Sequence, residues 1–120
     1  MPVVVGVLST PEGMRALDAA VTEAARRATP LVLVPGRVGE PVEPGFEAAE
    51  AAGVEARLAP ASEEIEFAAR LVEAAERTVA DVVVIGLRRR SPVGKLILGA
   101  GAQRILLDAP CPVLAVKPES

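Results

Sequence analysis

The amino-acid sequence predicts an α/β fold: one domain, residues 1–120, with a five-stranded parallel sheet flanked by helices in a Rossmann-like arrangement. Short apolar runs rich in valine and leucine alternate with longer segments whose apolar residues recur every three or four positions. Several short runs are apolar on both faces, which is typical of central strands in a parallel sheet. A chain of 120 residues can bury a core of its own, so no second domain is expected.

The predicted elements alternate along the whole chain. Strands are expected at residues 2–8, 30–34, 54–58, 81–86 and 111–118, and helices at residues 11–28, 46–53, 63–79 and 102–109. Thr10 and Ser62 are the expected N-caps of the first and third helices. The apolar stripes expected to face the sheet are Met14, Leu17, Val21, Ala24 and Ala28 in the first helix, and Ile65, Ala68, Ala69, Val72, Ala75 and Val79 in the third.

The composition excludes several classes of function. The chain has no histidine, so it has neither a Ser-His-Asp nor a Cys-His arrangement, and no histidine-ligated metal site is possible. The aspartates are too dispersed to suggest a carboxylate metal site, and no metal is expected. Phe46 and Phe67 are the only aromatic residues and the net charge is -3, which argues against a nucleic-acid partner.

The same sequence favours a cytoplasmic protein. A single cysteine, Cys111, cannot form an intrachain disulfide, as expected of a reducing compartment. The N-terminal segment has no basic region typical of a signal peptide, and no apolar run approaches the roughly 18 residues of a membrane helix, so no membrane partner is expected. Cys111 lies between two prolines and is interpreted as a small buried hydrophobe rather than a nucleophile.

Residues 86–108 form a basic segment in an acidic chain. They carry five basic side chains and one acidic side chain, Asp108. Two loops leave the carboxyl ends of predicted strands, where ligands bind in open α/β sheets. The candidate binding residues in these loops and at the helix start that follows are Leu8, Ser9, Thr10, Gly86, Arg88, Arg89, Arg90, Ser91, Gly99, Ala100 and Gly101.

The helix start near Gly99 is the reason for expecting an anion there. Its first residues have almost no side chains, and unpaired N–H groups at a helix start attract phosphate. A Walker phosphate loop is excluded, because Leu96 follows Lys95 where Ser or Thr is required, and Arg89 stands where the first glycine belongs. The alternative is that the arginines are only a solvated surface.

The segment after the fourth predicted strand also carries a family motif. In the form G-x2-G-x9-G-[ST], its positions fall on Gly86, Arg89, Gly99 and Ala100, and QRILLDAPCPVLAV follows. Here, and from VVVGVLST to PVLAVKP, the chain resembles the universal stress protein family. The resemblance implies that strands one and four are adjacent, so that their loops face one crevice. It also implies a homodimer formed by antiparallel pairing of the last strands, through Pro112, Val113, Leu114, Ala115 and Val116.

The resemblance also implies where a nucleotide would lie. ATP-binding members use an acidic residue at the end of strand one, backbone near the end of strand two, and the motif's glycines and Ser or Thr. The matching positions here are Leu8, Val34 with Pro35, Gly86, Arg89, Gly99 and Ala100. Leu8 has no polar group for a ribose, Arg89 is bulky, and Ala100 lacks the hydroxyl. We therefore expect a degenerate crevice that binds ATP or AMP weakly and holds phosphate better than a nucleoside.

Three functions remain open at this point. The first is a non-enzymatic stress-response module of universal stress protein type that senses a nucleotide or another phosphorylated small molecule. The second is a nucleotide sensor with weak ATPase activity, for which Glu12 is the carboxylate nearest to the first loop. The third is a dimeric interaction domain with a vestigial pocket. The first is favoured, because no catalytic constellation is visible.

Overall fold

Strands and helices alternate along the chain as the sequence predicts. The computed structural model describes residues 1–37, 39–60, 64–88 and 98–118. The elements are β1 (Val3–Val7), α1 (Pro11–Arg27), β2 (Leu31–Pro35), α2 (Glu43–Ala51), β3 (Ala56–Leu58), α3 (Phe67–Thr78), β4 (Val82–Gly86), α4 (Ala100–Asp108) and β5 (Val113–Val116). The described strands form one five-stranded parallel sheet with the order β3-β2-β1-β4-β5. The predicted fold class is therefore confirmed.

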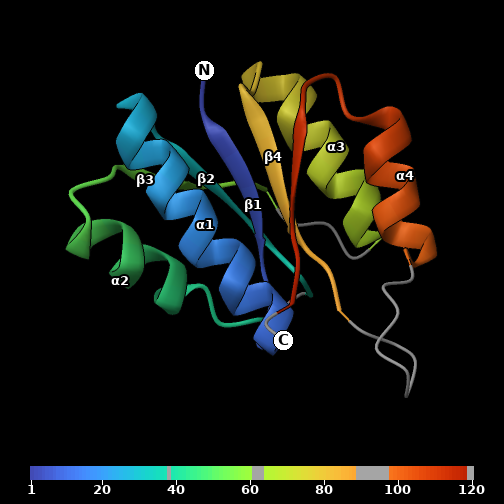
Figure 1. Cartoon of the computed structure of the whole chain (residues 1–120), viewed down its shortest axis with the longest axis horizontal. Helices are drawn as coiled ribbons and strands as arrows, with labels where there is room; N and C mark the ends of the chain where they lie inside the picture. Colours follow the sequence, from blue (N-terminus) through green and yellow to red (C-terminus); the bar gives the residue numbers. More distant parts are fainter. Residues whose placement is uncertain (38, 61–63, 89–97, 119–120) are drawn as a thin grey trace.

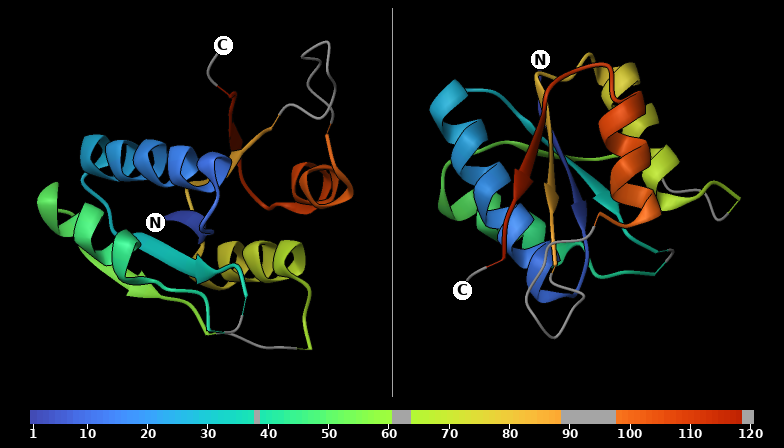
Figure 2. Two further views of the ribbon diagram at one scale, coloured as in Figure 1. Left: turned by 90° about the horizontal axis from the view of Figure 1, so that it is seen from below. Right: turned by 45° about the vertical axis from the view of Figure 1, so that its right-hand side comes forward.

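Helices cover both faces of the sheet. α1 and α2 lie on one face, and α3 and α4 on the other (Figure 1). In both views of Figure 2 the strands lie between these two pairs of helices. Because side chains alternate along a strand, Val3 and Val5 of β1 face α1, while Val4 faces α3. Both faces of the central strands are thus buried, which explains their continuous apolar sequence.

The strand order places the switch point of the sheet between β1 and β4. From β1 the chain moves outward to β2 and β3, and α3 then returns it to β4 on the other side of β1. The connections that follow β1 and β4 therefore leave toward opposite faces and open a crevice at the carboxyl ends of these strands. The adjacency of strands one and four, expected from the family resemblance, is confirmed.

Some element boundaries differ from the expected ones. α3 begins at Phe67 with Glu66 as its N-cap, and the expected cap Ser62 lies outside the described residues. β3 is shorter than predicted at its start, because the Val54 N–H donates to the Ala49 carbonyl (2.8 Å) and completes the end of α2. Thr10 is the N-cap of α1 as predicted, and its hydroxyl accepts from the Gly13 N–H at 3.0 Å.

The buried faces of two helices also differ from prediction. Met14 is 41% exposed, and the buried stripe of α1 is Gly13, Ala16, Leu17, Ala20, Val21 and Ala24. In α3, Ile65 precedes the helix and Val79 is 62% exposed, so neither belongs to the buried face. That face consists of Ala68, Arg70, Leu71, Val72, Ala74 and Ala75. Ala68, Val72 and Ala75 are buried as predicted, and Leu71 and Ala74 widen the buried face beyond the expected stripe.

Candidate functional site

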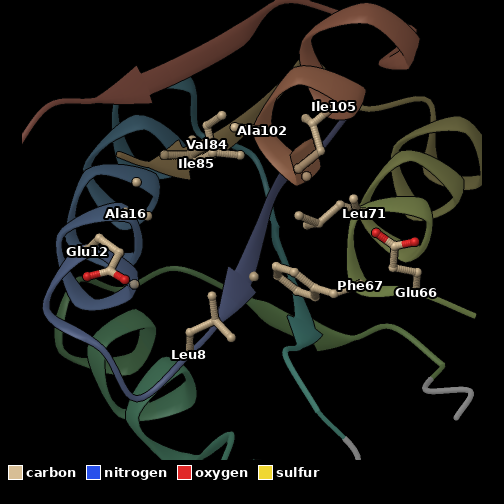
Figure 3. A pocket seen from close by; sticks show the side chains of 15 residues that line it. Leu8, Glu12, Ala16, Glu66, Phe67, Leu71, Val84, Ile85, Ala102 and Ile105 are labelled. Atoms are coloured by element: carbon tan, nitrogen blue, oxygen red, sulfur yellow. The ribbon is translucent and has the colours of Figure 1, made fainter. Parts of the chain in front are cut away.

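A cavity of about 230 Å³ lies at the carboxyl ends of β1 and β4, where the first turns of α1, α3 and α4 converge. Figure 3 shows its side chains. The lining residues are Gly6, Leu8, Glu12, Gly13, Ala16, Glu66, Phe67, Ala68, Leu71, Val84, Ile85, Gly86, Gly101, Ala102 and Ile105. Among the predicted site residues, Leu8, Gly86 and Gly101 line this cavity, although they come from three distant parts of the chain.

Two glycines at the strand ends permit close packing around the cavity. A Cβ at Gly86 would lie 2.1 Å from the Glu12 carbonyl oxygen, so this glycine lets β4 approach the start of α1. A Cβ at Gly6 would lie 2.1 Å from Cζ of Phe67, which means that the aromatic ring covers the backbone of β1. The glycines therefore have a packing role here, and their lack of a side chain is required by neighbours within the protein.

Leu8 forms an apolar part of the cavity wall. A Cβ at Gly36 would lie 2.0 Å from Cδ2 of Leu8, so the leucine side chain packs directly over the turn that follows β2. The end of β1 thus presents a hydrocarbon surface to the crevice. This position offers no hydrogen bond to a ligand.

Arg70 is the buried charged residue of the described chain, and it is not among the site residues predicted from the sequence. It is 7% exposed. Its guanidinium donates to the carbonyl oxygens of Ile65 (3.1 Å), Gly36 (2.9 Å) and Pro35, and lies 5.5 Å from the centroid of the Phe67 ring. The available sequence signal was spacing: Phe67, Arg70, Leu71 and Ala74 recur at the intervals of one helical face.

These contacts occupy the backbone at the end of β2. Arg70 donates hydrogen bonds to the carbonyl oxygens of Pro35 and Gly36. A ligand amine that bound here would compete with Arg70 for these acceptors. Val34, which was predicted as a site residue through its backbone, does not line the cavity, and its side chain is fully buried in the cluster below α3.

The start of α4 is exposed to the crevice. Gly99 is the N-cap and makes no side-chain capping bond, and the Gln103 N–H donates to the Gly99 carbonyl at 3.0 Å. Gly101 lines the cavity, whereas Ala100 is exposed beside it. Helix geometry leaves the first N–H groups without intrahelical partners, and the helix dipole makes this end favourable for an anion.

Charged side chains stand in pairs at the rim of the cavity. Arg88 Nη1 lies 4.0 Å from Glu12 Oε1, and Arg104 Nη1 lies 3.6 Å from Glu66 Oε2. The arginine side chains are 58% and 47% exposed. Such exposed pairs contribute little to stability, so either arginine can exchange its partner for a ligand anion at small cost.

Ser9 and Thr10, which were also predicted as site residues, do not line the cavity. The Ser9 N–H donates to Oε1 of Glu40 at 2.7 Å, and the Thr10 hydroxyl is engaged in capping α1. Arg89, Arg90 and Ser91 lie outside the described residues, so their place in the site stays a prediction.

Cys111 lies away from the crevice, just before β5. It is half-buried rather than fully buried as expected, and it packs beside the cluster below α3 and α4. Burial raises the pKa of its thiol, the charge of Asp81 adds to this, and a hydrogen bond with the Val83 backbone opposes it. A raised pKa keeps the sulfur protonated and therefore weakly nucleophilic at neutral pH.

Comparison with known proteins places the chain in a family. Residues 1–117 match the model described as the Universal stress protein family. The chain belongs to the universal stress protein family. This family member is 39% identical over 126 residues to a universal stress protein of Mycolicibacterium smegmatis, and the match covers 97% of each protein.

Solved structures of the family share its architecture. A universal stress protein from Archaeoglobus fulgidus has a TM-score of 0.84 and 29% identity, with 98% of both chains covered. A universal stress protein from the same organism, described as a complex with dAMP, has a TM-score of 0.77 and 24% identity, again over 98% of both chains. The second likeness shows the fold alone.

The described residues contain no helix with the length and apolar character that crossing a bilayer requires. They also hold no group of three or more His, Cys, Asp or Glu side chains arranged to bind a metal ion.

Proposed function

We propose that this family member is a non-enzymatic stress-response module whose crevice binds a phosphorylated small molecule, with the phosphate at the start of α4. One observation carries the proposal. The start of α4, at Gly99, Ala100 and Gly101, has no side-chain cap and borders the cavity at the carboxyl ends of β1 and β4. In open α/β sheets this is the position where ligands bind.

The chemistry of this helix start suits phosphate. Backbone N–H groups donate hydrogen bonds to phosphate oxygens, and the helix dipole adds to the attraction. Arg88 stands at the end of β4 with a long contact to Glu12, so its guanidinium can turn to the anion. Arg89, Arg90 and Ser91 are also proposed as part of this site, on the basis of the sequence alone.

ATP and AMP are expected to bind weakly. The Leu8 side chain gives no hydrogen bond to a ribose, and Arg70 already occupies the carbonyl groups at the end of β2. A nucleoside therefore finds few polar partners among the described residues, while the phosphate end keeps its donors. A universal stress protein of A. fulgidus with the same fold is described as a complex with dAMP, which supports a nucleotide as one kind of phosphorylated ligand to test.

The ionisable side chains that line the cavity are consistent with a role without catalysis. Among the residues that line the cavity, Glu12 and Glu66 are the ones with ionisable side chains, and each faces an arginine. General acid-base catalysis needs a group with a pKa matched to proton transfer near the reacting atoms. Sustained phosphate release from ATP by highly purified protein, abolished in Glu12→Gln, would favour the weak ATPase instead.

Calorimetric titration of ATP, inorganic triphosphate and adenosine tests the proposal. We expect ATP and triphosphate to bind weakly and with similar affinity, to lose affinity as salt is raised, and adenosine not to bind. Arg88→Ala should weaken the binding of ATP and of triphosphate by several-fold. A hydrogen bond to a charged group contributes about 1.5–3 kcal/mol, and an exposed hydrogen bond contributes less. Arg57→Ala is the matched control, because Arg57 is an exposed, ion-paired arginine of β3.

Two results would contradict the proposal. Tight ATP binding without triphosphate binding would mean that the nucleoside carries recognition. The absence of any anion binding would leave the third alternative, a dimeric interaction domain with a vestigial pocket.

A further inference from the structure

The cavity is lined almost wholly by hydrocarbon. Its large side chains are those of Leu8, Phe67, Leu71, Val84, Ile85 and Ile105 (Figure 3). Glu12 and Glu66 supply its polar side chains, and Figure 3 shows their carboxylates on opposite sides of the cavity. The other described lining residues have apolar side chains or none, so most of the interior offers a hydrocarbon surface that is suited to an apolar occupant.

The volume restricts the size of this occupant. About 230 Å³ is available. An apolar protein cavity of roughly 150 Å³ accommodates benzene, and pockets for drug-sized ligands begin near 300 Å³. The cavity is therefore large enough for one six-membered ring with a short substituent.

The cavity wall formed by Phe67, which covers Gly6 of β1, is held in place by contacts within the protein. The Phe67 ring lies over Gly6, and the Arg70 guanidinium beside it is fixed by the carbonyl groups of Pro35 and Gly36. Leu71 and Ile105 are 1% and 4% exposed, so they are immobilised by packing. A ligand that enters loses little free energy to ordering of the protein.

Small residues leave the space open on the α4 side. A Cβ added at Gly101 would meet the Ala68 Cβ at 3.9 Å, which is ordinary contact, and Ala102 also lines the cavity. A larger side chain at either position would fill space that the protein leaves free. Part of the apolar wall therefore makes no van der Waals contacts within the protein, and an apolar ligand would supply them.

The charges at the rim favour an uncharged ligand. Glu12 pairs with Arg88, and Arg104 is shared between Glu66 and Asp108, so these described ion pairs hold three carboxylates and two guanidinium groups. A charged group placed inside the apolar interior would lose its hydration without gaining a counter-charge there.

We propose that this cavity is a binding site for a compact, uncharged apolar molecule with the bulk of one six-membered ring. The site lies beside the proposed anion site at the start of α4 and does not depend on it. Its ligand is recognised by shape and by burial of apolar surface.

Titration with benzyl alcohol, followed by methyl NMR of Leu71, Ile85 and Ile105 and by calorimetry, tests the proposal. We expect saturable binding that shifts these methyl resonances, with a negative heat-capacity change. Ala102→Leu should weaken binding about tenfold or more, because its side chain fills the space of the ring. Ala25→Leu is the matched control: it makes the same change on an exposed helical position and should leave affinity unaltered.

Gly101→Ala provides a second variant if Ala102→Leu does not fold. It adds one methyl group to the cavity wall and should weaken binding to a smaller extent. The proposal is wrong if benzyl alcohol does not bind the wild-type protein, or if folded Ala102→Leu and Gly101→Ala bind it as well as Ala25→Leu does. Inorganic phosphate is titrated separately, so failure of the anion site is distinguished from failure of the apolar site.

Discussion

At the scale of single residues, Arg70 connects the end of β2, the segment before α3 and the aromatic wall of the cavity. Its guanidinium donates to carbonyl oxygens of Pro35, Gly36 and Ile65. Truncation of this side chain would leave buried carbonyl groups without donors. Buried unsatisfied polar groups cost more than the net value of the hydrogen bonds that are lost.

Arg70→Met is expected to reduce the free energy of unfolding by about 2–3 kcal/mol, since hydrogen bonds from a charged donor are lost and their acceptors stay buried. Urea unfolding followed by circular dichroism measures the change. Arg57→Met is the control: Arg57 is exposed and pairs with Glu55, so its loss should cost less than about 1 kcal/mol. Equal stability of the two variants would show that Arg70 is not structurally important.

At the scale of elements, the contact between β4 and the start of α1 depends on a missing side chain. The Glu12 carbonyl carbon and oxygen would lie 2.8 and 2.1 Å from a Cβ at Gly86. These are backbone atoms of a helix, so they cannot move aside as a flexible side chain does. Gly101 is the opposite case, because an added methyl group meets only ordinary contact.

Gly86→Ala should therefore lower the free energy of unfolding by about 1–3 kcal/mol through overpacking. Gly101→Ala should raise it by about 0.4–1 kcal/mol, because alanine restricts the unfolded chain at a helical position. Thermal and chemical unfolding of both variants provide the comparison. If Gly86→Ala were as stable as Gly101→Ala, the approach of β4 to α1 would not be as close as the structure shows.

At the scale of the whole molecule, β5 forms an open edge of the sheet. Its residues are not fully buried, and Leu114 is 38% exposed. The N–H groups of Val83 and Leu87 donate to the carbonyls of Pro112 and Val116, so the ladder to β4 uses alternate residues of this strand. By the same alternation, the backbone groups of Val113 and Ala115 point outward and are available to another strand.

We expect a homodimer in which β5 of one chain pairs with β5 of another, covering Leu114. Leu114→Lys should shift the protein to a monomer, measured by light scattering over a range of concentrations, because a charged side chain opposes edge pairing. Leu58→Lys is the matched control on the opposite edge strand, where Leu58 is 52% exposed. A monomeric wild-type protein, or equal dissociation by both substitutions, would contradict pairing through β5.

The alternation of strands and helices, the capping of α1 by Thr10 and the family were all predicted from the amino-acid sequence. These properties depend on apolar periodicity, turn residues and a local motif, which are all read within a short segment. The sequence also placed Leu8, Gly86 and Gly101 in one predicted site, because ligands bind at the carboxyl ends of parallel strands and the family resemblance implied that strands one and four are adjacent.

The character of that crevice depends on contacts between residues that are distant in sequence. Phe67 covers Gly6, Leu8 covers Gly36, and Arg70 reaches the end of β2, each across a long sequence separation. Local patterns leave the ends of a helix uncertain, which is why Ile65 and Val79, which lie outside α3, were expected on its buried face. Met14 is exposed and Arg70 is buried because neighbours distant in sequence decide which side of a helix is covered. Which side chains fill the space between elements depends on the packing of residues distant in sequence, because a protein interior is close-packed.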